Sequence, residues 1–240
     1  IVFGDWSSDV CSSDLNARKS NYSSVPNPNG PIDENGDGLS AQQLLVNFID
    51  NHDIPRFLYD NPNLASLHNV LFYLLTVDGI PCIYYGTEQQ FDGGNDPFNR
   101  EDLWTSGYDT GNETFQFIRH LIKLRKKLDP LRRGEMTIRW STERTGDEDD
   151  AGIFAFERSY QGDTVLVVLN ANDEHESVTS AAWMDGQDGN DMQTSFAEGD
   201  VLVNVFEDQD QTDDTIVVGA DGKVKITVQP RGGKIYIRER

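Results

Sequence analysis

An apolar run that stops abruptly in polar residues is the feature that most constrains the fold of this chain. Residues Leu44–Ile49 are apolar except for Asn47, and the polar tetrapeptide Asp50–Asp53 follows directly. This pattern is typical of a strand that is buried on both faces of a parallel sheet and presents polar groups at its C-terminal end. A second run of this kind, Gly79–Gly86, opens into a long polar loop. We therefore expect two parallel strands.

Helical periodicity follows each of the two expected strands. Apolar residues recur at helical spacing between Leu64 and Leu75, and again between Phe115 and Leu128. Thr110–Glu113 matches a capping box at the start of the second helix, and Asp129-Pro130 is expected to stop it. The order over residues 40–130 thus predicts two consecutive βα units, which cannot close a barrel by themselves.

The pattern changes to short β-rich runs after Gly134. Turn signals such as Asp221-Gly222 separate these runs, which predicts an antiparallel β-sandwich. The expected strands are Met136–Trp140, Gly152–Glu157, Thr164–Asn170, Val201–Phe206, Thr215–Val218, Lys223–Val228 and Lys234–Arg238. The fold class is α/β plus all-β, with an α/β domain over 16–133 and a sandwich domain over 134–240.

The first fifteen residues do not fit this organisation. Ser7-Ser8-Asp9 recurs as Ser12-Ser13-Asp14 without a helix or strand period, and the segment resembles translated sequencing-adapter DNA. We leave residues 1–15 out of the fold prediction. This exclusion also removes Cys11. The remaining cysteine, Cys82, lies in an apolar run, so we expect a small core residue and no disulfide framework.

Charge and hydropathy exclude two classes of partner. The formal net charge of −21 argues against nucleic acid, because phosphate contacts need clustered Lys and Arg. The acidity fits either adaptation to a saline setting or an ordinary solvated surface. No apolar stretch approaches the roughly 18 residues that a membrane-spanning helix needs, so no membrane partner is expected.

Both expected strands end in side chains suited to binding hydroxyl groups. His52 and Asp53 follow the first strand, whereas Glu88, Asp96 and Arg100 follow the second. Carboxylate, imidazole and guanidinium groups hold hydroxyls through charge-assisted hydrogen bonds. Each feature has a structural alternative as well. His52 and Asp53 can form a plain structural hydrogen bond, and Asp96 and Arg100 can form a local salt bridge.

Three motifs in this order resemble the α-amylase family, glycoside hydrolase family 13. Phe48–Asp53 resembles the family's fourth sequence region at barrel strand seven, and Asp78–Gln89 resembles its eighth strand. Gly93–Glu101 is similar to a loop of extracellular α-amylases and cyclodextrin glucanotransferases. The resemblance covers residues 25–240. It implies the C-terminal portion of a (β/α)8 TIM barrel, followed by the family's C-terminal antiparallel β-sandwich domain.

The resemblance also implies roles for four residues in a retaining enzyme that cleaves α-1,4-glucosidic bonds of starch-like glucans. Asp53 would be the transition-state-stabilising carboxylate, and His52 would donate to a sugar hydroxyl beside it. Asp96 and Arg100 would bind a glucose unit away from the cleaved bond. Glu88 is expected at the barrel rim as a structural or outer contact. The partner is an α-glucan polysaccharide or oligosaccharide, and the parent enzyme is expected to be secreted or periplasmic.

Two catalytic carboxylates of the family have no counterpart in this sequence. The nucleophile belongs to a Gly-x-Arg-x-Asp motif and the general acid is a Glu on another strand, and neither motif occurs. We therefore expect the chain to be a fragment that is inert by itself. The alternatives are a cyclodextrin glucanotransferase-like transglycosylase, a non-catalytic amylase-like transporter subunit, and a carbohydrate-binding protein. The oligomeric state stays open.

Metal binding and the exposed aromatics leave further expectations. Asp33–Gly38 matches the start of a calcium-binding EF-hand, but Ala41 and Leu44 stand at its ninth and twelfth positions. A polar turn is therefore expected, no metal ligand is assigned, and this segment requires no cofactor, although calcium remains possible in the intact parent. Trp104 and Tyr108 fit sugar stacking as well as packing, whereas Trp140 and Trp183 are expected to pack in the sandwich, with starch binding as the alternative.

Overall fold

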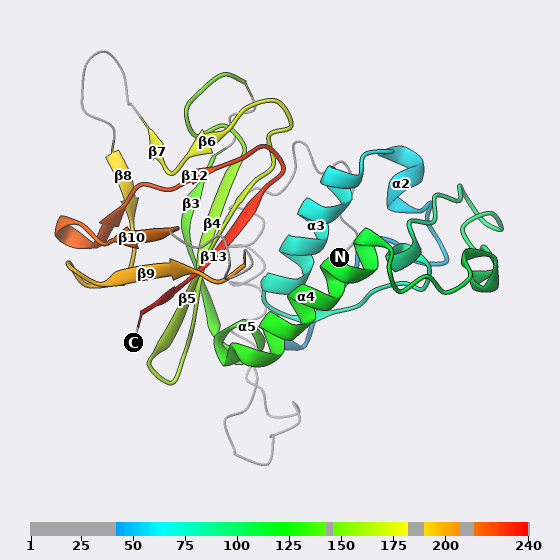
Figure 1. Cartoon of the computed structure of the whole chain (residues 1–240), viewed down its shortest axis with the longest axis horizontal. Coiled ribbons are helices and arrows are strands. Elements are labelled where there is room, and N and C mark those ends of the chain that lie inside the picture. The colour runs from blue at the N-terminus through cyan, green and yellow to red at the C-terminus, as the bar shows by residue number, and fades with distance from the viewer. Residues whose placement is uncertain (1–41, 143–145, 182–189, 207–213, 240) are drawn as a thin grey trace. The chain divides into compact units, whose positions relative to one another are not determined.

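The computed structural model describes residues 42–142, 146–181, 190–206 and 214–239 (Figure 1). These residues form two compact units, which divide between Lys127 and Leu128. The first unit contains helices and two short strands, whereas the second consists mainly of β-strands. In the described part of the chain, every helix is too short or too polar to cross a bilayer. Expectations for Asp33–Gly38 and Trp183 fall outside the described residues.

Two parallel strands lie at the base of the first unit. Strand β1 (Val46–Asn47) pairs with β2 (Ile80–Pro81) in parallel, with Val46 opposite Ile80. Hydrogen bonds from Ile80 N to Leu45 O (2.8 Å) and from Cys82 N to Asn47 O (2.8 Å) extend the pairing. A parallel pair requires a long crossover connection, here made by helices α2 (Phe57–Asp60) and α3 (Leu64–Thr76). The strands have the predicted order and direction, but they are much shorter than the apolar runs.

The expectation that both faces of these strands are buried is wrong. Val46, Ile80 and Cys82 are exposed, whereas Asn47 and Ile49 are buried. Successive side chains of a strand point to opposite faces, so this alternation means that only one face of the ladder is covered. Cys82 is consequently an exposed residue and not the core residue that its apolar neighbours suggested.

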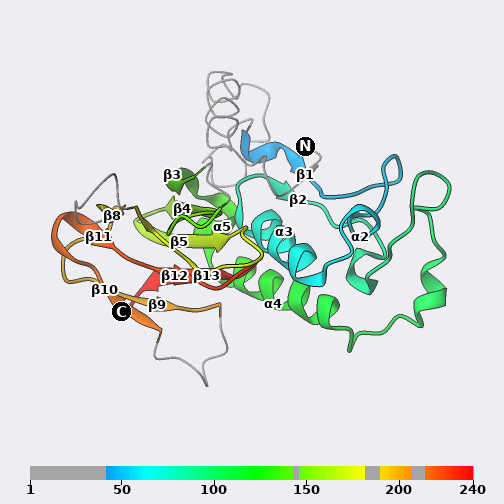
Figure 2. The same cartoon turned by 90° about the horizontal axis from the view of Figure 1, so that it is seen from above.

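Helices α3 and α4 (Glu113–Lys127) run alongside each other, as Figure 2 shows. Asn63 caps α3 by accepting from the backbone N–H groups of Ala65 and Ser66. At the start of α4, Asn112 Oδ1 accepts from Thr114 N at 2.9 Å, so Asn112 performs the capping that we expected from Thr110. A short helix, α5 (Asp129–Arg133), begins where α4 was expected to stop and belongs to the second unit, with Pro130 in its first turn.

The remaining elements of the first unit are three short 3-10 helices. They are η1 (Gln42–Leu44), η2 (Thr87–Gln89) and η3 (Leu103–Ser106). The last two lie in the polar loop that follows β2. Their hydrogen bonds fix the course of a loop that has little regular structure.

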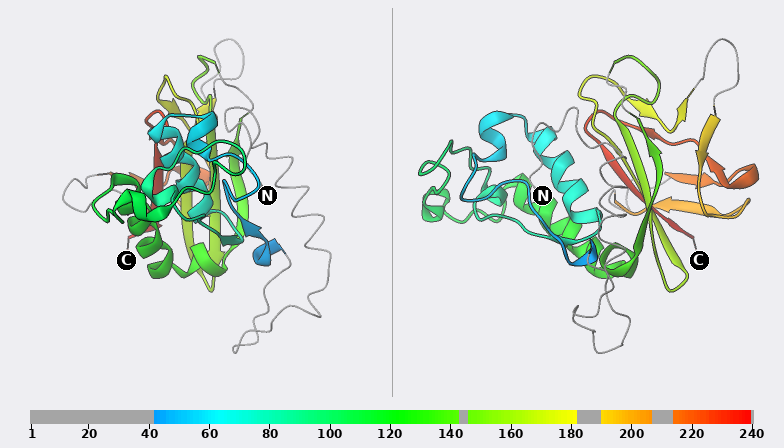
Figure 3. Two further views of the ribbon diagram at one scale, coloured as in Figure 1. Left: turned by 90° about the vertical axis from the view of Figure 1, so that its right-hand side faces the viewer. Right: turned by 180° about the vertical axis from the view of Figure 1, so that it is seen from behind.

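The second unit is built from antiparallel strands in two layers (Figure 3). The larger sheet has the order β10-β9-β13-β5-β4-β3, and two smaller sheets have the orders β11-β8-β7 and β12-β6. The strands are β3 (Glu135–Ser141), β4 (Ile153–Tyr160), β5 (Asp163–Asn170), β6 (Ser177–Val178), β7 (Ser180–Ala181), β8 (Asn190–Gln193), β9 (Val201–Asn204), β10 (Thr215–Val217), β11 (Lys223–Val224), β12 (Thr227–Val228) and β13 (Gly233–Arg238). The sequence did not predict β6, β7 and β8, which are short and rich in polar residues. A 3-10 turn, η5 (Ala220–Gly222), precedes β11.

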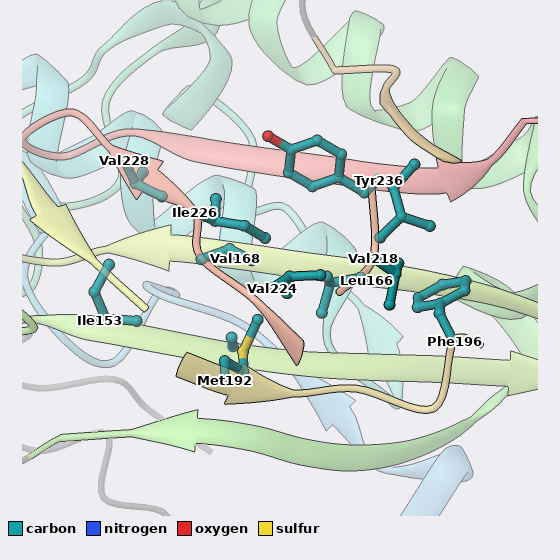
Figure 4. Close-up of a cluster of buried hydrophobic side chains, with 12 residues drawn as sticks. Ile153, Leu166, Val168, Met192, Phe196, Val218, Val224, Ile226, Val228 and Tyr236 are labelled. Atoms are coloured by element: carbon teal, nitrogen blue, oxygen red, sulfur yellow. The ribbon is translucent and has the colours of Figure 1, made fainter. Parts of the chain in front are cut away.

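The core of the second unit lies between these two layers (Figure 4). Leu166 and Val168 of β5 and Tyr236 of β13 meet Met192 of β8 and Val224 of β11, and all five are almost completely buried. Burying such a side chain contributes about 1.5–3 kcal/mol, so this cluster accounts for much of the stability of the unit.

A polar network beside this core predicts how acid should affect stability. Asp214 accepts hydrogen bonds from Lys234 Nζ (2.8 Å), Tyr236 Oη (2.8 Å) and Asn204 Nδ2 (3.0 Å). Burial acts to raise the pKa of Asp214, but these hydrogen bonds and the Lys234 charge outweigh it, so the pKa lies below its ordinary value. The stability from this carboxylate should be fully present above the unfolded pKa of about 3.9 and be lost as pH falls through the lower folded pKa.

We therefore expect Asp214→Asn to lower the free energy of unfolding at pH 7 by about 1–3 kcal/mol, because an amide is a weaker acceptor for these donors. The same substitution should flatten the loss of stability below about pH 4. Urea unfolding at several pH values measures both effects, and Glu198→Gln at an exposed position is the matched control. An unchanged acid profile in Asp214→Asn would contradict the assignment.

Candidate functional site

The loop after β1 starts with Asp50, a buried carboxylate that has a structural role. Asp50 Oδ1 accepts from Thr87 Oγ1 at 3.0 Å, and Oδ2 accepts from Phe57 N at 3.2 Å. Burial raises the pKa of Asp50 above its ordinary value, against the lowering effect of these two hydrogen bonds. Asp50 thus joins the loop after β1 to η2 after β2, and it leaves the residues that follow it free to face solvent.

His52 and Asp53 lie directly beyond this anchor and are exposed. His52 Nε2 lies 3.3 Å from Asp53 Oδ1, and their side chains are 62% and 68% exposed, respectively. Asp53 N donates to Asn51 Oδ1 at 2.8 Å, a local turn that fixes the backbone of the loop. A pair this exposed contributes little to stability, so its groups are available to a ligand.

Asp96 and Arg100 form a second exposed pair on the loop after β2. Arg100 Nη2 lies 3.0 Å from Asp96 Oδ1, and the same nitrogen donates to the backbone carbonyl of His52 at 3.3 Å. This last contact brings the two pairs together although 48 residues separate Arg100 from His52. The four site residues predicted from the sequence therefore lie in one group.

A buried arginine that the sequence analysis did not single out holds the two loops together. Arg56 is fully buried, and its Nε donates to Glu101 Oε2 at 3.0 Å. Its Nη1 donates to the carbonyl of Tyr85 at 2.7 Å, and its guanidinium lies 4.1 Å from the ring centroid of Tyr84. A cation stacked on an aromatic ring and paired with a carboxylate is held in one orientation.

Glu101 and the backbone of Gly93 complete this arrangement. Glu101 Oε1 accepts from Gly93 N at 2.6 Å, and Gly93 O accepts from Arg56 N at 2.9 Å. A Cβ at Gly93 would lie 1.9 Å from Phe98 O, so no other residue fits there without a backbone shift. Both ends of the loop that carries Asp96 and Arg100 are therefore tied to Arg56.

Asn99 also connects the two loops: it lies on the loop after β2, and its side chain bonds to the loop after β1. Its Nδ2 donates to the carbonyl of Ile54 at 2.8 Å and to that of Asn51 at 3.4 Å, and the residue is fully buried. These carbonyls lie on either side of His52 and Asp53. Asn99 therefore helps to fix the segment that presents the two residues to solvent.

The other candidate residues lie outside this group of contacts. Glu88 Oε2 accepts from Gly86 N at 2.8 Å, which agrees with a structural role in the turn after β2. Trp104 and Tyr108 are exposed and do not pack in the core. Trp140 is partly buried and donates from Nε1 to Asp150 Oδ2 at 3.0 Å, as a packed residue would. Within the described ranges, no group of three or more His, Cys, Asp or Glu residues could hold a metal ion.

The arrangement suits the recognition of a molecule rich in hydroxyl groups. Two carboxylates, an imidazole and a guanidinium are exposed on adjoining loops, and two buried side chains fix the backbone beneath them. Charged acceptors and donors of this kind form short hydrogen bonds to hydroxyls. Arg56, Asn99 and Glu101 supply rigidity to the site, which is what a preorganised site needs from its supporting residues.

Comparison with known proteins gives consistent matches over most of the chain. Cyclomaltodextrin glucanotransferase of Bacillus sp. (strain 1-1) is 34% identical over 179 residues, which cover 75% of this chain and 22% of that protein. α-Amylase 1 of Schizosaccharomyces pombe is 32% identical over 197 residues, which cover 82% of this chain and 28% of the relative. The chain thus spans about a quarter of the length of these curated relatives.

Solved structures and a family model agree with these relatives. The α-amylase of Geobacillus thermoleovorans, solved in complex with acarbose, matches with a TM-score of 0.64 and 26% identity over 82% of this chain and 39% of that one. The family model described as the α-amylase catalytic domain matches residues 17–196, three quarters of the chain. The chain therefore belongs to the α-amylase family of glycoside hydrolases.

Proposed function

We propose that this chain forms part of a retaining α-glucan-active hydrolase and contributes His52, Asp53, Asp96 and Arg100 to its substrate site. The observation that carries the proposal is the hydrogen bond from Arg100 Nη2 to the His52 carbonyl, which joins the two loops that carry the exposed polar pairs. Starch-like glucans with α-1,4 bonds offer many hydroxyls to such a surface. The acarbose complex of the Geobacillus α-amylase supports a carbohydrate ligand.

In the proposed architecture, β1 and β2 are the last two strands of a (β/α)8 barrel, and the β-rich unit is the family's C-terminal domain. Barrel enzymes place their active sites at the C-terminal ends of the strands. His52 and Asp53 follow β1, and Asp96 and Arg100 follow β2, so the positions of all four agree with this architecture. The parallel pairing of β1 with β2 supports it further.

In the proposed mechanism, Asp53 stabilises the transition state. Retaining hydrolysis passes through oxocarbenium-like transition states, and hydrogen bonds from the enzyme to ring hydroxyls strengthen there. Asp53 would accept such a bond from a hydroxyl at the cleaved unit, while His52 would donate to a neighbouring oxygen. Asp96 and Arg100 would hold a glucose unit farther along the chain. The covalent step needs a nucleophile and a general acid about 5–5.5 Å apart, and this sequence has neither motif.

Transglycosylation is the second candidate function, because the match to the Bacillus cyclomaltodextrin glucanotransferase covers three quarters of the chain. In that reaction a sugar hydroxyl replaces water as the acceptor of the glycosyl group. The four polar residues serve both reactions equally. Product analysis of the parent enzyme separates them: free reducing sugar indicates hydrolysis, whereas cyclic or elongated glucans indicate transfer.

We expect the purified 240-residue chain to release no reducing sugar from soluble starch above a no-protein control. A positioned general acid alone contributes roughly 10²–10⁴-fold, and the nucleophile would be missing as well. The parent polypeptide, with the upstream coding sequence restored, should hydrolyse starch and release the α-anomer first, as measured by NMR. Turnover by the isolated chain would show that the catalytic assignment is wrong.

The parent should also leave the cytoplasm, since its glucan substrate is a large polymer. We propose a secreted or periplasmic location, tested by assaying activity in the culture medium and in the periplasmic fraction of the host. Calcium stays a proposal for the parent alone. No group of metal-binding side chains occurs among the described residues, so we expect chelation to leave the melting temperature of the isolated chain unchanged.

A further inference from the structure

Tyr59 presents an exposed aromatic ring next to the loop that carries Asp96 and Arg100. It lies on α2 and is 55% exposed, although its neighbour Leu58 is buried. Its ring lies against Gly94: a Cβ added at Gly94 would be 2.9 Å from Tyr59 Cε2 and 3.1 Å from Cζ. The absence of a side chain at Gly94 therefore allows the ring to rest on the loop backbone. The proposed function assigns nothing to Tyr59.

The backbone on both sides of this contact is fixed. Tyr59 N donates to Arg56 O at 3.0 Å, and Arg56 N donates to the carbonyl of Gly93, directly before Gly94. Gly93 N in turn donates to Glu101 Oε1. The ring thus stands on a base held by a fully buried arginine, and an aromatic side chain with two rotatable bonds loses little further freedom on binding.

The position of this ring relative to the two charged residues follows from the chain itself. Gly94 precedes Asp96 by two residues, a separation of about 7 Å at most between their Cα atoms. Asp96 is bound to Arg100, and Arg100 reaches the carbonyl of His52. An apolar ring and a set of hydroxyl-binding groups therefore lie next to each other on one exposed surface.

We propose that Tyr59 is a stacking platform for an α-glucan, which binds the glucose unit adjacent to the one held by Asp96 and Arg100. This inference rests on the proposed function and extends its site by one unit. The two faces of a glucose ring carry mainly C–H groups, whereas its edge carries hydroxyls. The faces suit contact with an aromatic ring, and the edge suits Asp96 and Arg100. A glucan chain is the ligand that uses both kinds of surface at once.

The test is an NMR titration of the 240-residue chain with methyl α-D-glucoside, which has one glucose unit, and with maltohexaose. The wild-type chain should bind the hexasaccharide more tightly, because a single glucose unit cannot reach both Tyr59 and the charged pair. Tyr59→Ala should weaken maltohexaose binding about three- to tenfold and leave methyl α-D-glucoside binding within twofold. Tyr59→Phe, which keeps the ring, should bind both sugars like the wild type. Val217→Ala, an exposed apolar position in the other unit, is the matched control.

Gly94→Ala tests the same idea with Tyr59 in place. The new Cβ pushes the ring away from the loop, so maltohexaose binding should fall as it does in Tyr59→Ala. This variant also guards against misfolding of Tyr59→Ala, since a Cβ can be accommodated by moving the far end of one flexible side chain. Equal melting temperatures of the variants would establish that the fold is intact.

The outcomes separate this inference from the proposed function. Arg100→Ala could weaken the binding of both sugars while Tyr59→Ala and Gly94→Ala weaken the binding of neither. In that case the proposed glucan site stands and the stacking platform at Tyr59 is wrong. A loss of methyl α-D-glucoside and maltohexaose binding by equal factors in folded Tyr59→Ala would also overturn the platform. If the wild-type chain binds neither sugar at millimolar concentration, both the platform and the proposed glucan contact fail.

Discussion

Asp53→Asn in the intact parent enzyme should lower kcat and kcat/KM together by on the order of 10²–10³-fold, roughly 2.7–4 kcal/mol, with little change in KM. The reason is that a carboxylate that binds a sugar hydroxyl most strongly in the transition state contributes to the rate and hardly to substrate binding. The amide keeps the size of the side chain but offers a weaker, neutral acceptor. Because the Asp53 side chain is exposed and pairs only with His52 among the residues that the structure describes, the substitution should not change the melting temperature.

Arg100→Ala in the same enzyme provides the contrast. A contact to a glucose unit away from the cleaved bond is made equally in the ground state and the transition state, so its loss raises KM and largely spares kcat. Steady-state kinetics and thermal melts of both variants distinguish the two roles. A wild-type kcat in Asp53→Asn would mean that the site placed at this strand end does not exist. A lowered melting temperature with normal activity per folded molecule would leave both residues a structural role alone.

Glu101→Ala should lower the free energy of unfolding of the first unit by about 3–5 kcal/mol. The substitution leaves Arg56 without its carboxylate partner, and a buried, uncompensated charge is costly. The side chain of Arg56 is fully buried, so water cannot replace the lost partner without rearrangement. Hydrogen exchange of the α3 amides measures this effect, because it reports on the first unit separately from the second.

Removing the other partner of the pair, by Arg56→Met, should lower the free energy of unfolding by less than Glu101→Ala does. Glu101 is 25% exposed and can be rehydrated once its partner is gone, and methionine fills most of the space that the arginine occupied. The double variant should be more stable than the sum of the single effects implies, since it leaves no charge unpaired. Equal losses in both single variants, or strict additivity in the double variant, would show that the pair is not coupled in this way.

The local features of this fold were predictable from the sequence, because local patterns report them directly. The spacing of apolar residues between Leu64 and Leu75 located α3, and the apolar runs that end in polar residues located β1 and β2 in the right order and direction. The same runs misled us about burial. A run of apolar residues says nothing about whether a second layer covers its far face, and Val46 and Cys82 are exposed for that reason.

In the site, too, the sequence predicted the residues that form local motifs but not those that pair across long sequence separations. His52 and Asp53 are adjacent in sequence, and Asp96 and Arg100 are four residues apart, so each pair was visible as a motif. The residues that support them were not visible. Arg56 meets Glu101 across 45 residues, and Asn99 meets Ile54 across 45 residues, and neither pair shares a periodicity that would connect them. The one available signal was that Asn99 and Glu101 lie within the motif that resembles the family's loop.

The two cross-links between the loops bear on how the chain tolerates changes in length. Arg56 holds Gly93 and Glu101, Asn99 holds Ile54 and Arg100 holds the His52 carbonyl, so four residues of the segment 93–101 are attached to residues 51–56. An insertion or deletion within this segment would break at least one attachment and move Asp96 or Arg100. Over residues 102–107 the hydrogen bonds that the structure describes are local, and Gln89 then exchanges two hydrogen bonds with the backbone of Asp109. Changes in length between Leu103 and Tyr108 should therefore be absorbed at the surface, which makes this the place to graft a longer loop in protein engineering.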